Sequence, residues 1–175
     1  MRKEVLLMTG AGQIGLAIAR RMGYGKKIVI ATRNVQKAQT TLETLTNAGF
    51  DAVVIQMDMS KRESIVNAVK EAQEYGPIKM LVNAAGVSPS QASIQQILDV
   101  DLLGTAILLE EVRKVIVEGG VGVTISSQSG FRMKQLTPEE DRALAMTPTE
   151  DLLKLDILQP ENIENTLKAY QLAKR

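Results

Sequence analysis

Short apolar runs alternate with helical segments from the start of the chain, and this alternation limits the possible folds more than any other feature. The runs are rich in branched apolar residues, as in KIVIAT and DAVVIQM. Strands separated by helices pair in parallel through right-handed crossovers, and helices then cover both faces of the sheet. We therefore predict an α/β fold, a three-layer, doubly wound Rossmann-type parallel sheet of strand order 3-2-1-4-5. The expected strands are residues 4–9, 27–32, 51–57, 78–83 and 121–126.

Capping residues predict where the helices begin. Asn34 is placed to cap one helix, and Ser60 with Glu63 forms the pattern of a capping box for the next. Thr137 and Thr147, each followed by proline, predict two further helix starts. The other expected helices are residues 12–22, a long apolar helix at 94–117, and a last one from about 160 to the end.

The composition is that of one globular domain, because 175 residues with 45% apolar and 23% charged side chains can bury a single core. The net charge of +1 argues against a nucleic-acid partner. The sequence shows no signal peptide and no apolar stretch long enough to cross a bilayer. We expect a protein of the cytoplasm that does not bind membranes.

Two residue types are missing altogether, since the sequence has no cysteine and no histidine. Their absence excludes disulfides and thiolate nucleophiles, and it removes the commonest metal ligands and the usual general base. We expect no metal site. Any acid–base chemistry must use Tyr, Lys, Asp, Glu or Ser.

The first strand runs directly into a glycine-rich turn that opens the first helix. The turn reads Thr9-Gly10-Ala11-Gly12-Gln13-Ile14-Gly15, a GxGxxG spacing. Glycines let the backbone approach a pyrophosphate, and the helix N-terminus offers N–H donors and partial positive charge. The alternative is a purely structural tight turn. In this strand–turn–helix context the sequence favours a nucleotide site.

The second strand ends in Thr32-Arg33, where NAD-specific sites carry an acidic residue. The arginine fork suits a 2′-phosphate, which favours NADP(H) while NAD(H) stays possible. The alternative is an ordinary exposed arginine.

Two further groups follow later strands, where doubly wound sheets bind ligands. They are Asp58-Met59 and Asn83-Ala84-Ala85-Gly86. Taken alone, each is also compatible with a helix cap or a small-residue turn.

The glycine turn, Asp58, the 83–86 segment, Ser126-Ser127 and Tyr170-x-x-x-Lys174 occur in the order typical of short-chain dehydrogenases/reductases. The chain resembles this family over essentially its whole length. The resemblance implies a carbonyl or secondary alcohol substrate and a nicotinamide cofactor.

The resemblance also implies roles for single residues. Asp58 and the Met59 backbone would contact the adenine, and residues 83–86 would line the cofactor. Ser127 would hold the substrate oxygen, Tyr170 would exchange its proton, and Lys174 would bind the nicotinamide ribose together with Tyr170. The residues agree with this chemistry, because an ammonium one helical turn from a phenol favours the phenolate.

Three departures from the family pattern stand out. Asp101 replaces an asparagine that many members use beside the catalytic residues. The spacing from Ser127 to Tyr170 is unusually long, so we expect residues 131–160 to form a helical insertion beside the substrate site. Family members continue past the YxxxK helix with strands 6 and 7, so we expect residues 1–175 alone to form an incomplete domain with little turnover.

Two other functions are compatible with the sequence. One is a non-catalytic, regulatory Rossmann protein that binds a dinucleotide, and the other is an assembly module. The apolar helix at 94–117 favours self-association, and the family resemblance implies a homodimer or homotetramer.

Overall fold

The computed structural model describes residues 2–175 and divides the chain into two compact units. Unit 1 comprises the residues up to Ala85 together with Leu108–Ile125, and unit 2 comprises Gly86–Ile107 and Ser126–Arg175. No helix among the described residues is long and apolar enough to span a membrane. The expectation of a single domain stays a prediction.

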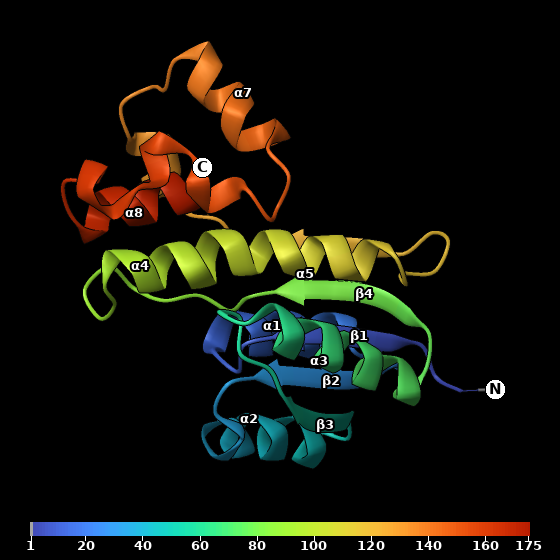
Figure 1. The fold of residues 1–175 in the computed structure, drawn as a ribbon. Coiled ribbons are helices and arrows are strands. Elements are labelled where there is room, and N and C mark those ends of the chain that lie inside the picture. The colour runs from blue at the N-terminus through green and yellow to red at the C-terminus, as the bar shows by residue number, and fades with distance from the viewer. Residues whose placement is uncertain (1) are drawn as a thin grey trace. The chain divides into compact units, whose positions relative to one another are not determined.

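Unit 1 is built on a five-stranded parallel sheet of order β3-β2-β1-β4-β5, and Figure 1 shows β1 to β4 side by side. This order confirms the predicted topology. The strands are β1 (Val5–Thr9), β2 (Lys27–Thr32), β3 (Asp51–Gln56), β4 (Ile78–Asn83) and β5 (Val121–Thr124).

Side-chain alternation along the strands separates the two faces of the sheet. On one face Leu6, Met8, Ile28 and Ile30 form a fully buried cluster that helices α1 (Gln13–Met22) and α2 (Val35–Asn47) cover. Helix α3 (Arg62–Tyr75) contacts β1, β2 and β3 through its own buried face. Helices on both faces give the three predicted layers.

Two predicted helix starts in unit 1 have different outcomes. Asn34 caps α2 as expected, because its side chain accepts the Lys37 N–H at 2.8 Å. The capping box at Ser60 is wrong, since Lys61 is the N-cap of α3 and makes no side-chain cap. The Ser60 hydroxyl donates instead to Asp58 Oδ1 at 2.7 Å, so the nearby carboxylate outcompetes the helix end.

The single long helix expected at 94–117 is also wrong. It consists of α4 (Ile94–Ile97), the π-helical segment η1 (Leu98–Leu103) and α5 (Gly104–Arg113). The Gly104 N–H donates to Asp99 O, five residues earlier, so the chain is wound more widely here. Turns follow Arg113, so α5 ends before the expected helix end at residue 117.

Unit 2 contains short helical pieces around a core that includes Ile97, Leu98, Leu152 and Leu158. The Thr137 helix start is confirmed as a capping box, but Thr147 ends that helix instead of starting one. Figure 1 shows long connections on both sides of α7. The pieces after β5 are α6 (Gln128–Arg132), α7 (Pro138–Met146), the 3₁₀ turns η2 (Leu152–Lys154), η3 (Asp156–Leu158) and η4 (Pro160–Asn162), and α8 (Thr166–Ala173).

The last helix begins later than expected. Pro160 opens only the 3₁₀ turn η4, and α8 starts at Thr166. The Asn165 side chain accepts the Lys168 N–H at 2.9 Å, which is the cap that positions α8.

Candidate functional site

The first strand ends in a turn at which only glycine fits. Gly10 has a φ of 76°, in the left-handed region that favours glycine. A Cβ at this position would lie 3.0 Å from Ala85 Cα and 3.1 Å from Ala84 O. The glycine that was expected for ligand approach therefore also lets two backbone segments of unit 1 meet.

A buried hydrogen-bond network lies behind this turn. Thr9 and Asn83 face each other in the β1–β4 register and are 0% and 1% exposed. Thr9 Oγ1 donates to Asn83 Oδ1 at 2.6 Å and accepts the Ala85 N–H at 3.2 Å. Asn83 O in turn accepts the Ile125 N–H at 2.9 Å. Thr9 and Asn83 thus fix the carboxyl ends of β1, β4 and β5.

The N-terminus of α1 is open to ligands. Gly12 is its N-cap and makes no side-chain cap, and a Cβ there would meet no atom within 4 Å. Gln13 and Ile14 are exposed, with Ile14 at 58%. Gly15, in contrast, is buried and packs closely against β1, since a Cβ at this position would lie 2.8 Å from Met8 Sδ. The three glycines therefore serve the backbone turn, the open helix end and helix–strand packing.

One support of the turn was missed by sequence reasoning. Thr41 Oγ1, on α2, donates to Ala11 O at 2.8 Å. A threonine inside a helix carries no signal of such a contact, since the distance in sequence is large. The contact holds the turn against α2.

The end of β2 presents a cation beside a carboxylate. Arg33 is exposed and Asp58 is half-buried. Burial alone would raise the pKa of Asp58, but hydrogen bonds from the Ser60 hydroxyl and N–H, helped by the charges of Lys61 and Arg33, lower that pKa overall. Asp58 is therefore an anion at neutral pH. Met59, next to it, is buried at 6% exposure.

In unit 2, Ser127 and Lys174 line the same cavity, which has a volume of about 380 Å³. The neighbouring Ser126 hydroxyl donates to Lys174 O at 2.5 Å, which ties the start of α6 to the end of α8. Ser127 Oγ accepts the Ser129 N–H at 3.1 Å and caps α6. The serine and lysine that the sequence singled out are thus brought together.

Tyr170 and Lys174 lie one turn apart at the end of α8, as their spacing predicts. The Lys174 ammonium is 5.6 Å from the centre of the Tyr170 ring. The ring is half-buried and also packs against the apolar core of unit 2. The Lys174 ammonium is therefore within cation–π distance of the Tyr170 ring.

Asp101 is the most deeply buried charged residue of the candidate set, at 2% exposure on η1. Its Oδ1 accepts the Val87 N–H at 2.8 Å, and its Oδ2 lies 3.7 Å from Lys174 Nζ. Within the described residues Oδ2 accepts no hydrogen bond. Burial raises the pKa of the Asp101 carboxyl, although the Lys174 charge and the Val87 N–H act in the opposite direction. Asp101 thus faces the lysine directly.

Gly86 belongs to this same group and not to the glycine turn of unit 1. A Cβ on Gly86 would lie 3.1 Å from Asp101 Oδ1 and 3.4 Å from Lys174 Nζ. Among the described residues no cluster of three or more carboxylate, histidine or cysteine side chains is placed to hold a metal ion.

The family model for short chain dehydrogenases matches residues 4–138. The chain belongs to this family. The match includes the glycine turn, Asn83 and Ser127, and it ends before Tyr170 and Lys174. Family membership confirms what the order of motifs indicated.

Two relatives from this family match most or all of the chain. The short-chain dehydrogenase/reductase bsc3 of Alternaria brassicicola is 33% identical over 100% of this chain and 64% of its own length. The galactitol 2-dehydrogenase of Agrobacterium fabrum is 28% identical over 78% of this chain and 57% of its own. The chain therefore spans less than two thirds of the length of these relatives.

Solved structures share the fold. A variant of the actinorhodin polyketide ketoreductase, determined with NADPH, has a TM-score of 0.64 and 31% identity, and covers 75% of this chain and 56% of its own. The crystal structure of gox2181 has a TM-score of 0.66 and 28% identity, over 78% of this chain and 58% of its own.

Proposed function

We propose that this chain is the cofactor-binding and catalytic part of an NADP(H)-dependent oxidoreductase that transfers a hydride between the nicotinamide and a carbonyl or secondary alcohol. The observation that carries the proposal is the cavity of unit 2 in which Ser127 and Lys174 meet, with Tyr170 one turn away. Membership in the short-chain dehydrogenase family supports a nicotinamide cofactor. Unit 1 supplies a glycine turn of the kind that dinucleotides use.

The residues of unit 1 fit the phosphate part of a dinucleotide. The open space at Gly12 and the uncapped start of α1 leave room and N–H donors for a pyrophosphate. Gly10 has no Cβ and so lets the turn pack closely against Ala85. The hydrogen bond between Thr9 and Asn83 holds the strand ends next to this turn in place. Asp58 and the Met59 backbone are proposed to contact the adenine, and Ala84 and Ala85 to line the cofactor. When bound, the nicotinamide donates or accepts the hydride.

The residues of unit 2 handle the proton. Ser127 is proposed to hold the substrate oxygen by a hydrogen bond, and Tyr170 to give it a proton or take one away. Lys174 holds the nicotinamide ribose with Tyr170, and its positive charge stabilises the phenolate that forms. No histidine is needed for these steps, which agrees with a sequence that has none.

NADP(H) is proposed over NAD(H) because Arg33 is exposed at the end of β2, where no acidic residue stands. The ketoreductase neighbour was determined with NADPH, which supports the same choice. A charge-assisted bond to a 2′-phosphate contributes about 1.5–3 kcal/mol, or roughly 10- to 100-fold in affinity.

The test is a titration of the purified chain with NADPH and NADH, followed by turnover on a panel of carbonyl compounds. Arg33→Ala is expected to weaken NADPH by roughly tenfold or more and to leave NADH within about twofold. Arg20→Ala, exposed on α1, is the control for the lost charge. Equal affinity of the unaltered chain for both cofactors would refute the assignment of NADP(H).

A second candidate is a regulatory protein that binds the dinucleotide without turnover. The carboxylate of Asp101, 3.7 Å from Lys174, favours it, because an anion there opposes the charge that the tyrosine needs. Turnover of any compound in the carbonyl panel would exclude the regulatory function. NADPH binding without turnover is compatible with both candidates, because little turnover is expected of residues 1–175 in either case. The low turnover expected of residues 1–175 alone stays a prediction.

Residues 131–160 are proposed to help form the substrate site. Phe131, at 88% exposure, and Asp141 line the cavity that contains Ser127.

Self-association also stays a prediction. Leu109 on α5 is 44% exposed, and light scattering after gel filtration would measure the mass of the assembly.

A further inference from the structure

Two cavities of unit 2 share a wall. The first holds Ser127 and Lys174, and the second, of about 270 Å³, lies against it because both are lined by Asp141 and Arg175. The second cavity extends between α7 and the end of α8. It contains neither Ser127 nor Tyr170 in its lining, so the proposed chemistry does not use it.

The shared wall is an ion pair with well-formed geometry. Arg175 Nε donates to Asp141 Oδ1 at 2.8 Å, and Arg175 Nη2 donates to Asp141 Oδ2 at 2.9 Å. Both side chains are partly exposed, at 29% and 42%. The pair therefore marks a polar boundary that solvent reaches, and side chains held this way can move apart at small cost.

The remaining lining of the second cavity is hydrocarbon. It consists of Leu102, Leu144, Ala145, Leu172 and Ala173. Binding sites for whole small ligands have volumes of about 300–1,000 Å³. A cavity of about 270 Å³ is smaller than that range, so it suits one part of a ligand whose other part occupies the neighbouring cavity.

We propose that the second cavity holds the apolar chain of the substrate, and that the substrates are therefore carbonyl compounds or alcohols with a hydrocarbon tail. This inference rests on the proposed function, because Ser127 in the first cavity holds the oxygen end. The Asp141–Arg175 pair separates the polar from the apolar part of the ligand. Each methylene that enters the cavity leaves water, and affinity rises by about three- to fourfold per methylene.

The test measures the affinity of the purified chain for a series of 2-alkanones, from butanone to decanone, by saturation-transfer NMR with and without NADPH. In the unaltered chain affinity is expected to rise by roughly three- to fourfold per methylene until the cavity is full. Ala145→Phe fills the cavity from the exposed side of α7, so it flattens this rise while butanone and NADPH affinity stay unchanged.

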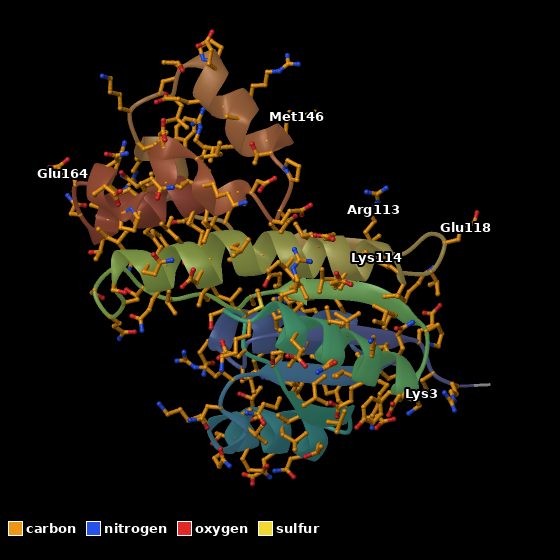
Figure 2. All side chains as sticks on the ribbon, in the orientation of Figure 1. Lys3, Arg113, Lys114, Glu118, Met146 and Glu164 are labelled. Atoms are coloured by element: carbon orange, nitrogen blue, oxygen red, sulfur yellow. The ribbon has the colours of Figure 1, made fainter. Side chains whose placement is uncertain are left out.

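Met146→Phe is the matched control, because Met146 lies next in the same helix (Figure 2). It is 71% exposed and lines neither cavity. It is expected to keep the rise with chain length. NADPH binding combined with a flat series in the unaltered chain would overturn the tail assignment alone. Loss of all NADPH binding by the unaltered chain would overturn the proposed function itself. Circular dichroism checks that each variant folds. The alkanone series in the unaltered chain tests the proposal even if a variant does not fold.

Discussion

The two units of this chain are stabilised by different means. Unit 1 has strands of four to six residues in one sheet, and the Leu6–Met8–Ile28–Ile30 cluster is fully buried. The helical pieces that lie wholly in unit 2 have three to nine residues, and α7 buries no residue at all. Polar groups differ too, because Thr9 and Asn83 satisfy each other while Asp101 keeps an oxygen without a hydrogen bond from the described residues.

This difference suggests that unit 1 holds its glycine turn rigidly, whereas the helices of unit 2 move more easily. A turn that approaches phosphates must hold its backbone, and unit 1 fixes it with a sheet and a buried hydrogen bond. Weakly buried helices such as α7 open at low cost, which suits the proposed substrate site of unit 2. We infer that the units differ in local stability because they do different work.

The largest expected effect is in amide hydrogen exchange. Amides of β1, β2 and β4 are expected to exchange at least roughly 100-fold more slowly than those of α7 and the 3₁₀ turns. The reason is that hydrogen bonds of buried strands break only when unit 1 as a whole unfolds. Exchange followed by mass spectrometry on peptides from each unit measures this. Similar protection in α7 and β1 would remove the basis of the comparison.

The next effect comes from Gly10→Ala in unit 1. Positive φ and the 3.0 Å approach to Ala85 together are expected to cost about 2–4 kcal/mol of unfolding free energy, and NADPH binding is lost with the turn. Gly25→Ala is the matched control, since Gly25 has a φ of 74° but no atom within 4 Å of a Cβ. It isolates the backbone strain, about 1 kcal/mol. Equal losses in both variants would show that the close approach to Ala85 contributes nothing.

The same contrast explains how far sequence reasoning reaches. The bounds of β2 and β4 were predicted to the residue, because branched apolar runs indicate strands locally. The start of α2 was predicted because its cap, Asn34, also acts locally. The meeting of Thr9 with Asn83 follows from the parallel topology, which brings the carboxyl ends of strands to one edge.

Failures concentrate where distant contacts decide the structure. The π-helical winding at Asp101 and the 3₁₀ turns after Thr147 leave no local pattern. Ser60 was misassigned because the Asp58 carboxylate, two residues away, competes for its hydroxyl. The Thr41–Ala11 and Arg175–Asp141 bonds need the folded chain to be seen at all.

The smallest effect is expected from Asp101→Asn, and it tests the electrostatics of unit 2. Burial raises the pKa of Asp101 above its ordinary value of 3.8, with Lys174 opposing. A carboxyl with a raised pKa in the folded state stabilises the fold only while protonated, so that stability is lost as pH rises through the raised pKa. The amide does not titrate. The unfolding free energy of Asp101→Asn relative to the unaltered chain is therefore expected to increase with pH, by on the order of 1 kcal/mol in all.

Lys174→Met sharpens the same measurement, because it removes a charge that lowers the pKa of Asp101. With the lysine gone, ionisation of the buried carboxyl costs more, so the loss of stability with rising pH becomes larger and continues to higher pH. Melting curves between pH 3 and 8 on both variants decide the matter. If Asp101→Asn instead becomes less stable than the unaltered chain as pH rises, the attraction between Asp101 and Lys174 outweighs the cost of burying them. The Asp101–Lys174 ion pair would then stabilise the packing of α8 on η1. In that case the lysine's charge would stabilise the fold and would not be available to the tyrosine.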